Sequence, residues 1–158
     1  MADAEAELRQ RLHDLARADE GVEGATAEEI AALEAYAGGR LPGVYRHYLS
    51  GFGRRAGELF RGTDSGLAQR HRLRLREPAD RLVESSRAAF RLPPAAFVFL
   101  MTQGYQFAYF PTDAGDDPPV FRYHEGDALP APLAASLSVY LLRCVEECER
   151  RMPASTPA

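Results

Sequence analysis

Residues 96–110, AFVFLMTQGYQFAYF, constrain the fold more than any other stretch of the chain. The first run, 96–101, is apolar at every position, which is typical of a strand that is covered on both faces. The TQG segment offers Gly104 for a positive φ, so it predicts a tight turn into a second strand over 105–110. We therefore expect an antiparallel hairpin in the middle of a sheet.

The second strand of this hairpin would carry large side chains on both faces. One face would hold Tyr105, Phe107 and Tyr109, and the other would hold Gln106 and Phe110. Because aromatic residues are favoured in strands, one interpretation is that both faces are simply core. The alternative is that one face covers helices while the other is partly open, and that open face is where we expect a binding surface.

Helices are expected over 2–18, 27–37, 41–51, 78–90 and 132–150, because apolar residues recur there at helical spacing. The second helix has clear ends: Thr26 and Glu29 match a T-x-x-E capping box, and Gly38 with Gly39 provides a left-handed stop. Besides the hairpin, strands are expected over 58–61, 70–77 and 120–127.

The chain has 158 residues, of which 46% are hydrophobic, and this is the size and composition of one globular domain. The order of elements predicts a single α+β domain over 1–152, an antiparallel meander with helices packed on one face. Residues 153–158, PASTPA, are expected to form a disordered tail.

The segment 70–77 is the most prominent charged feature. Its arginines, Arg70, Arg72, Arg74 and Arg76, alternate with His71, Leu73 and Leu75. This alternation predicts a strand with one solvated face. The arginine row could also contact nucleic acid or a carboxylate-rich protein partner. A solvated face is the favoured interpretation, because the chain as a whole is acidic.

The formal net charge of −4 gives no support for a phosphate backbone or an anionic membrane as partner, whereas a basic protein is easily accommodated. The N-terminal residues lack the pattern of a signal peptide, and no apolar run is long enough to span a bilayer. We therefore expect a cytoplasmic protein that binds neither nucleic acid nor membrane.

No recognisable catalytic or metal-binding motif occurs in the sequence. The four histidines fall in different predicted elements, and there is no nucleophile elbow, phosphate-binding loop or H-E-x-x-H. Asp113, Asp116 and Asp117 lack the spacing of a calcium loop. Cys144 and Cys148 lie four apart in a helical pattern, with no second pair to complete a zinc site. No enzyme activity, cofactor or metal is predicted.

The sequence resembles the SUKH superfamily of Smi/Knr-type domains. LPGVYRHYL matches its L-P-x-x-[YF]-x-x-[FY]-L pattern, and FVFLMTQGYQFAYF is similar to its central hairpin with a Q-G-Y-x-F turn. The matching residues are Leu41, Pro42, Tyr45, Tyr48, Leu49, Gln103, Gly104, Tyr105 and Phe107. DDPPVFRYHEGD and ASLSVYL resemble the strand and the closing helix that follow.

This resemblance implies a non-enzymatic binding domain. Many bacterial members look like immunity proteins that block a toxin delivered by neighbouring cells, and fungal members act as interaction modules. The hypothesis is an immunity protein that neutralises a basic toxin by direct binding. The candidate partner contacts are Tyr105, Tyr109, Tyr123, Asp113, Asp116, Asp117 and Glu125. A general regulatory interaction module and a small-ligand-binding domain remain as alternatives.

Overall fold

The computed structural model describes residues 2–153 of the chain. Its main sheet consists of β3 (Ala96–Thr102), β4 (Gln106–Pro111), β5 (Val120–His124) and β6 (Ala131–Ala134), in that order and antiparallel throughout. The α+β antiparallel meander expected from the sequence is confirmed. The expected tail lies almost wholly in 154–158, outside the described residues.

The predicted hairpin is β3 and β4. Gln103 and Gly104 both have positive φ, of 47° and 79°, as the two central residues of a type I′ turn require. The Tyr105 N–H closes the turn by donating to the Thr102 carbonyl at 3.1 Å. A bulge between Val98 and Leu100 shifts the register of β3 against β4.

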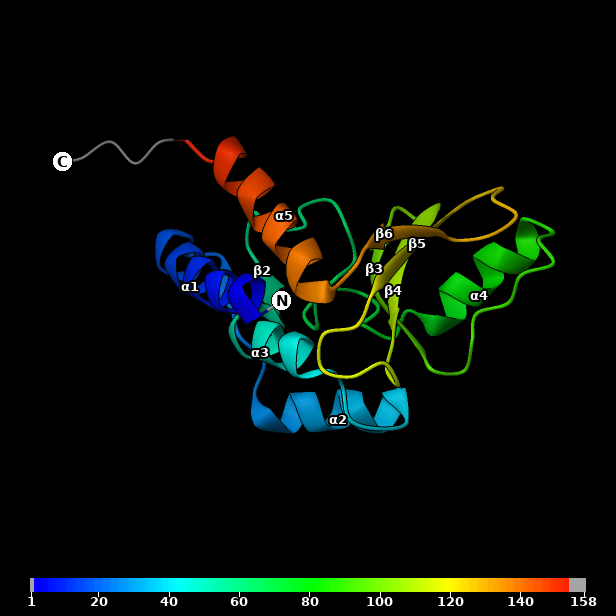
Figure 1. Ribbon diagram of the computed structural model, residues 1–158, viewed down its shortest axis with the longest axis horizontal. Helices are drawn as coiled ribbons and strands as arrows, with labels where there is room; N and C mark the ends of the chain where they lie inside the picture. Colours follow the sequence, from blue (N-terminus) through cyan, green and yellow to red (C-terminus); the bar gives the residue numbers. More distant parts are fainter. Residues whose placement is uncertain (1, 154–158) are drawn as a thin grey trace.

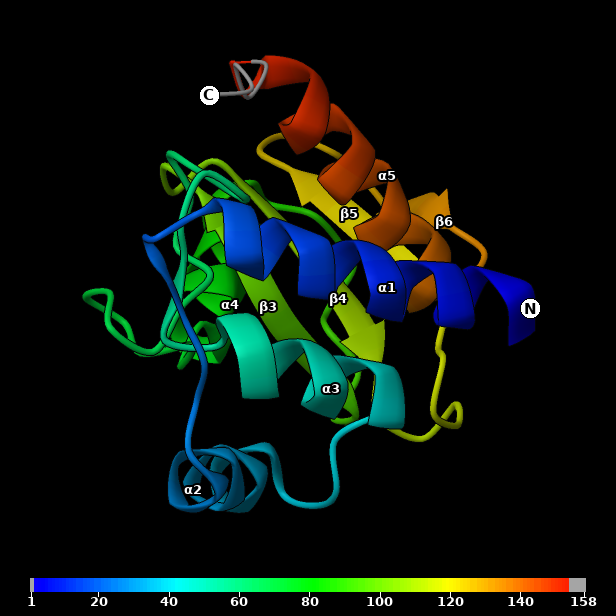
Figure 2. The same ribbon diagram turned by 90° about the vertical axis from the view of Figure 1, so that its left-hand side faces the viewer.

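Helices lie on both sides of this sheet (Figures 1 and 2). On one side are α1 (Ala2–Ala18), α3 (Gly43–Phe52) and α5 (Leu137–Arg151), and α2 (Ala27–Ala37) packs against α3. On the other side lies α4 (Arg76–Ser85), next to β3. The helices therefore cover more of the sheet than one face.

The aromatic side chains of the hairpin fill both of these layers. Tyr45 of α3 contacts Phe97, Phe99 and Phe110, with ring centroids 5.1–6.0 Å apart. On the opposite face, Phe107 stacks on Tyr123 of β5 at 5.5 Å, and Phe90, beyond α4, stacks on Tyr123 at 6.1 Å. All of these β3, β4 and β5 rings are buried. Among residues 2–153, the hairpin therefore has no partly open face of the kind that we expected, because α4 and the segment after it cover the second face.

Local sequence signals place most helix ends correctly. Helix α1 runs from Ala2 to Ala18 as predicted, and both halves of the capping box between Thr26 and Glu29 are formed. Gly38 ends α2 with a φ of 86°. Helix α3 continues through Gly51 to Phe52, one residue beyond the stop that we expected.

Three predicted elements are corrected by the structure. Residues 58–61 form turns, and the short strand nearby is β2 (Arg55–Ala56), which pairs with β1 (Val22–Glu23). The helix expected over 132–150 begins only at Leu137, because Ser136 caps it and Ala131–Ala134 form the edge strand β6. The helix expected from Pro78 begins at Arg76 and ends at Ser85.

The strand predicted at 70–77 is wrong as well. Residues 70–73 form turns, Arg72 and Leu73 have positive φ of 51° and 62°, and α4 begins at Arg76. Leu73 and Leu75 are nonetheless fully buried. The alternation therefore predicted correctly that both leucines are buried, but it predicted the wrong hydrogen bonding, because the left-handed residues Arg72 and Leu73 turn the backbone at the first of the two leucines.

Arg76, the last arginine of that row, is only partly exposed and makes contacts within the protein. Its guanidinium donates to the carbonyls of Leu92 and Pro93, both at 2.9 Å, and pairs with Asp80 at 3.0 Å. It thereby fastens the start of α4 to the segment that leads into β3.

Tyr45 provides a test of how the sheet and α3 are joined. Tyr45→Ala should lower the free energy of unfolding by about 3–5 kcal/mol, because a fully buried ring and its four aromatic contacts are removed. Tyr45→Phe should change it by less than about 1 kcal/mol, because the hydroxyl has no hydrogen-bond partner among the described residues. Urea unfolding of both variants measures this, and equal losses would mean that the hydroxyl, not the ring, holds the junction.

Candidate binding surface

Two connections meet at one end of the sheet, the β3–β4 turn and the β5–β6 loop. The Tyr105 carbonyl accepts the Glu125 N–H at 2.8 Å, and the Tyr105 ring lies 5.4 Å from the His124 ring. Tyr105 is 38% exposed and Leu129 is 69% exposed. We call Tyr105, His124, Glu125 and Leu129 the turn-end surface. It combines two exposed apolar side chains with a carboxylate.

The β5–β6 loop is fixed by its own hydrogen bonds. The Asp127 carboxylate accepts the His124 N–H at 3.2 Å, and its carbonyl accepts the Tyr123 hydroxyl at 2.8 Å. The Gly126 N–H donates to the hydroxyl of Ser86, the C-cap residue directly after α4, at 3.0 Å. A surface held in place in this way loses little conformational freedom when a partner binds.

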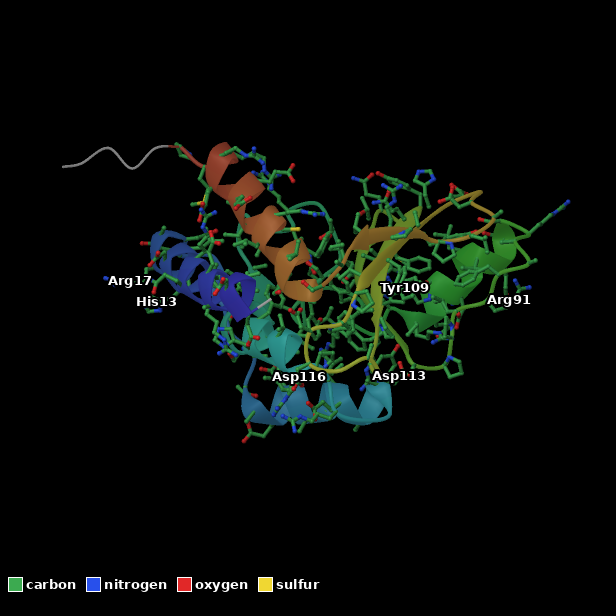
Figure 3. All side chains as sticks on the ribbon, viewed as in Figure 1. His13, Arg17, Arg91, Tyr109, Asp113 and Asp116 are labelled. Carbon is green, nitrogen blue, oxygen red and sulfur yellow. The ribbon has the colours of Figure 1, made fainter. Side chains whose placement is uncertain are left out.

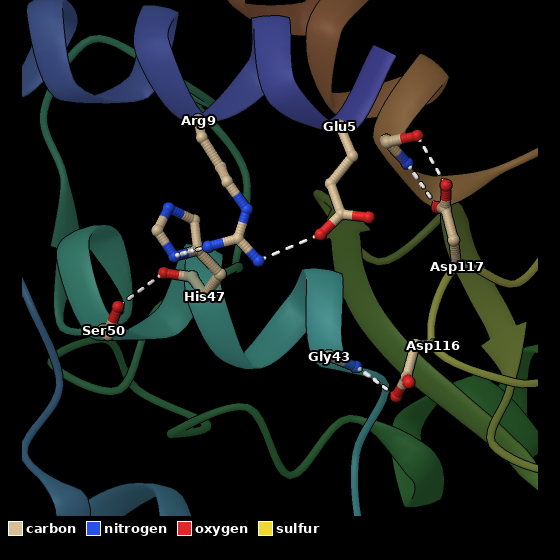
Figure 4. A network of polar contacts seen from close by, with 8 residues as sticks. Glu5, Arg9, Gly43, His47, Ser50, Asp116 and Asp117 are labelled. Atoms are coloured by element: carbon tan, nitrogen blue, oxygen red, sulfur yellow. Dashed lines mark hydrogen bonds and ion pairs between the residues drawn. The ribbon is translucent and has the colours of Figure 1, made fainter. Parts of the chain in front are cut away.

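The aspartates of the 112–119 loop lie at the opposite end of the sheet (Figure 3). Asp116 accepts the Gly43 N–H with its carboxylate at 3.0 Å and the Val44 N–H with its carbonyl at 3.1 Å. Asp117 accepts both the N–H and the hydroxyl of Ser138, at 2.8 and 2.6 Å. The two carboxylates therefore hold the N-termini of α3 and α5, where negative charge is favourable (Figure 4).

Asp113 differs from these two neighbours. It is exposed, and its carboxylate makes no hydrogen bond or ion pair with the described residues. Of the three aspartates it is the one whose charge is left for solvent or a partner. A role of Asp116 and Asp117 as partner contacts stays a prediction, and it would have to compete with their hydrogen bonds to the helices.

Tyr109 and Tyr123 lie inside the molecule, on the face of the sheet toward α4. They are 5% and 0% exposed, and burial raises the pKa of the Tyr109 hydroxyl above its ordinary value. Figure 3 shows Tyr109 between the sheet and α4. The seven predicted contacts thus do not form one site. Tyr105 and Glu125 come together, Asp113 lies apart from them, and the other four serve the packing or the helix ends.

A pocket of about 430 Å³ lies between α4, β3 and the end of α2, and the sequence analysis missed it. Val98, Pro94 and Tyr36 contribute to its lining. Glu77, Asp80 and Glu84 of α4 line it as well, and their spacing of three and four residues was the signal that could have placed them on one helix face. Glu77 pairs with Arg81 at 2.7 Å and Asp80 with Arg76, so most of its charges are already neutralised within α4.

The cysteines are poorly suited to nucleophilic chemistry. Burial raises the pKa of the Cys144 thiol to about 11, which keeps it protonated at neutral pH, and Cys148 is 1% exposed. Between residues 2 and 153, no three His, Cys, Asp or Glu side chains are placed to hold a metal ion. None of the helices in the same range is long and apolar enough to cross a membrane.

His47 connects α3 to α1. Its Nδ1 lies 3.0 Å from the Arg9 guanidinium, which also pairs with Glu5 at 2.9 Å (Figure 4). Since a guanidinium can only donate, Nδ1 must be the acceptor and the ring is neutral. Burial and the charge of Arg9 both lower the pKa of His47 below its ordinary value of 6.5.

This contact predicts an acid-sensitive contribution to stability. Because the folded pKa of His47 is depressed, its contribution is complete above pH 6.5 and is lost as the pH falls through the folded-state value. The unfolding free energy of the wild type should therefore decline more steeply below pH 6.5 than that of His47→Gln. His13→Gln, on the exposed face of α1, controls for the loss of a histidine, and parallel curves for wild type and His47→Gln would refute the prediction.

The aspartates of the 112–119 loop provide a matched pair of variants. Asp117→Ala should destabilise the fold by about 2 kcal/mol, because it removes both bonds to Ser138 at the start of α5. Asp113→Ala, in the same loop, should change stability by less than about 0.5 kcal/mol. Thermal or urea unfolding measures both, and equal effects of the two substitutions would argue against the capping role.

Comparison with known proteins gives one family. The SMI1 / KNR4 family (SUKH-1) matches residues 24–143, a span that runs from the approach to α2 into α5 and includes the whole sheet and the turn-end surface. Comparison with curated proteins gives no match. Since the family match covers most of the chain, this protein belongs to the SMI1 / KNR4 family (SUKH-1).

Proposed function

We propose that this protein is a cytoplasmic immunity protein that neutralises a bacterial toxin by binding it directly, without catalysis. The observation that carries the proposal is the family match over residues 24–143, since the SUKH resemblance implies a binding domain and, for many bacterial members, protection against a toxin. The half-buried Cys144 is poorly suited to covalent chemistry, because burial raises the pKa of its thiol to about 11.

The turn-end surface is the proposed contact. Aromatic residues on a rigid frame make good anchors, because they bury a large area and lose little side-chain entropy. Tyr105 satisfies this description, since the I′ turn and the bond to Glu125 fix its backbone while its ring stays exposed. Leu129 adds a second apolar contact on the same end of the sheet.

Charge would act mainly on the rate of encounter. The chain carries a net charge of −4, and Glu125 lies beside Tyr105, so a basic toxin would be attracted to this end of the molecule. The toxin would then be blocked by occlusion, with Tyr105 and Leu129 excluding water at the centre of the contact.

Co-expression with the product of an adjacent toxin-like gene tests the proposal. Wild-type protein should restore growth and co-purify with the toxin, and Tyr105→Ala with Leu129→Ala should weaken binding by at least about tenfold, as expected for central anchors. Arg17→Ala, an exposed residue on α1, is the matched control and should protect like the wild type.

Three results would contradict parts of this proposal. If the wild type neither rescues growth nor forms a complex, the immunity function is wrong for that toxin. If it rescues growth and the double variant does so equally well, the function stands but the turn-end surface is not the contact. If purified wild type turns over a substrate of the toxin, the non-enzymatic role is wrong.

A further inference from the structure

A groove of about 400 Å³ runs between α2 and the segment that connects β2 to α4. It is lined by Glu29, Ala32, Leu33, Arg54, Arg55, Leu67, Ala68, Arg72 and Arg74, and we call it the arginine groove. Four arginines thus gather on one concave surface of a chain whose net charge is −4. This local positive charge is opposite in sign to the net charge of the whole chain.

The carboxylates nearby neutralise only half of this charge. Arg54 pairs with Glu23 at 2.8 Å and with Glu29 at 3.3 Å, and Arg55 pairs with Glu23 at 3.4 Å. These two carboxylates thereby serve Arg54 and Arg55. Arg72 and Arg74 are exposed and make no ion pair with any residue between 2 and 153.

The backbone holds Arg72 and Arg74 in place although they are exposed. Leu73 and Leu75 alternate with them and are fully buried, so the segment is anchored in the core. The Arg72 N–H donates to the Gln69 carbonyl at 3.1 Å and the Arg74 N–H to the His71 carbonyl at 2.8 Å.

The side chain of Arg74 is also oriented. Its guanidinium lies over the Tyr36 ring, 5.4 Å from the centroid. Backbone strain accompanies this arrangement, since Arg72 and Leu73 both adopt the left-handed conformation that such residues rarely take. Both arginines line the groove, and the backbone that carries Arg72 is held in this rarely adopted conformation.

We propose that the arginine groove binds a carboxylate-bearing segment of a protein partner. Guanidinium groups bind carboxylates through two parallel hydrogen bonds, and two uncompensated ones are available here. The lining of the groove also includes four apolar residues that could contact the apolar side chains of a peptide, namely Ala32, Leu33, Leu67 and Ala68. The ligand class is thus a peptide in which acidic residues alternate with apolar ones.

The same lining disfavours a nucleic acid. None of the nine lining residues is aromatic, so the groove lacks the aromatic side chains on which successive bases of a single strand stack. Beyond the groove, the acidic surplus of the chain would repel a long phosphate backbone. A short acidic segment avoids that repulsion because its charge is confined to the groove.

This inference is independent of the immunity function, because it requires only the groove and not a toxin. The arginine groove would also select a partner of opposite charge to the one proposed for the turn-end surface, namely an acidic segment and not a basic toxin. A failure of toxin rescue therefore leaves it intact, and a failure of acidic peptide binding leaves the toxin contact intact.

Fluorescence anisotropy with defined probes tests the groove. The probes are a labelled peptide of alternating Glu and Leu, a peptide of alternating Lys and Leu, and a short single-stranded DNA. The Glu/Leu peptide should bind, the Lys/Leu peptide should not, and added salt should weaken the binding because the contacts are charged. Arg72→Glu with Arg74→Glu should raise the dissociation constant by at least about tenfold.

A charge-matched control variant separates the effect of the groove arginines on affinity from the effect of the protein's net charge. Arg17→Glu with Arg70→Glu makes the same change in net charge at two exposed positions outside the groove, and should alter the affinity by less than about twofold. Circular dichroism establishes that each variant is folded. If the Glu variant unfolds, Arg72→Gln with Arg74→Gln takes its place, with a smaller but clear loss of affinity.

The proposal is overturned by any of three results. The first is that the Glu/Leu peptide does not bind the wild type. The second is that the control pair of substitutions weakens binding as much as the groove pair. The third is that the DNA binds more tightly than the peptide and does so through Arg72 and Arg74.

Discussion

The packing of the Tyr45 ring against the central hairpin is the interaction on which the other elements depend. Tyr45 is fully buried and contacts rings from both β3 and β4, so it fixes α3 across the sheet. Helix α3 in turn contacts α1, α2 and α5. Asp116 and Asp117 then fasten the starts of α3 and α5 to the loop that leaves β4. An aromatic contact and two carboxylate caps together set the positions of the elements on this side of the sheet.

Helices on both faces of the sheet determine where a partner can bind. With α4 on one side and α1, α3 and α5 on the other, the aromatic rings of the hairpin are committed to the core. Among the described residues, the large apolar side chains that stay exposed lie at one end of the sheet, Tyr105 and Leu129, and on α2, Tyr36. The rigid sheet therefore presents its connecting turns, as is common where a stable scaffold carries variable contacts.

Local signals allowed much of this fold to be predicted from the sequence. The capping box at Thr26, the left-handed Gly38 and the turn at Gly104 each depend on residues close together in the chain, and all three are confirmed. The family resemblance, which depended on Tyr45 and its neighbours, is confirmed as well. Each of these features can be recognised without knowledge of what packs against it.

Tertiary contacts explain what could not be predicted. Asp116 and Asp117 bond to residues 73 and 21 positions away, so a local pattern could describe them only as turn residues. Tyr109 is buried because α4 and its neighbouring segment cover that face, which periodicity cannot reveal. The alternation of residues 70–77 predicted the burial of Leu73 and Leu75 correctly, but it missed the internal contacts of Arg76 and predicted the wrong hydrogen bonding. A strand needs a neighbouring strand, and this segment instead turns at Arg72 and Leu73.

The account depends most on the claim that a protein partner docks on the turns of a sheet whose faces are already filled. Hydrogen–deuterium exchange of the protein, free and bound to the proposed toxin partner, measures this directly. Exchange should slow in the β3–β4 turn and the β5–β6 loop, while the buried strands keep the protection they have in the free protein. Slowed exchange confined to α1 and α5, with the turns unchanged, would contradict the account.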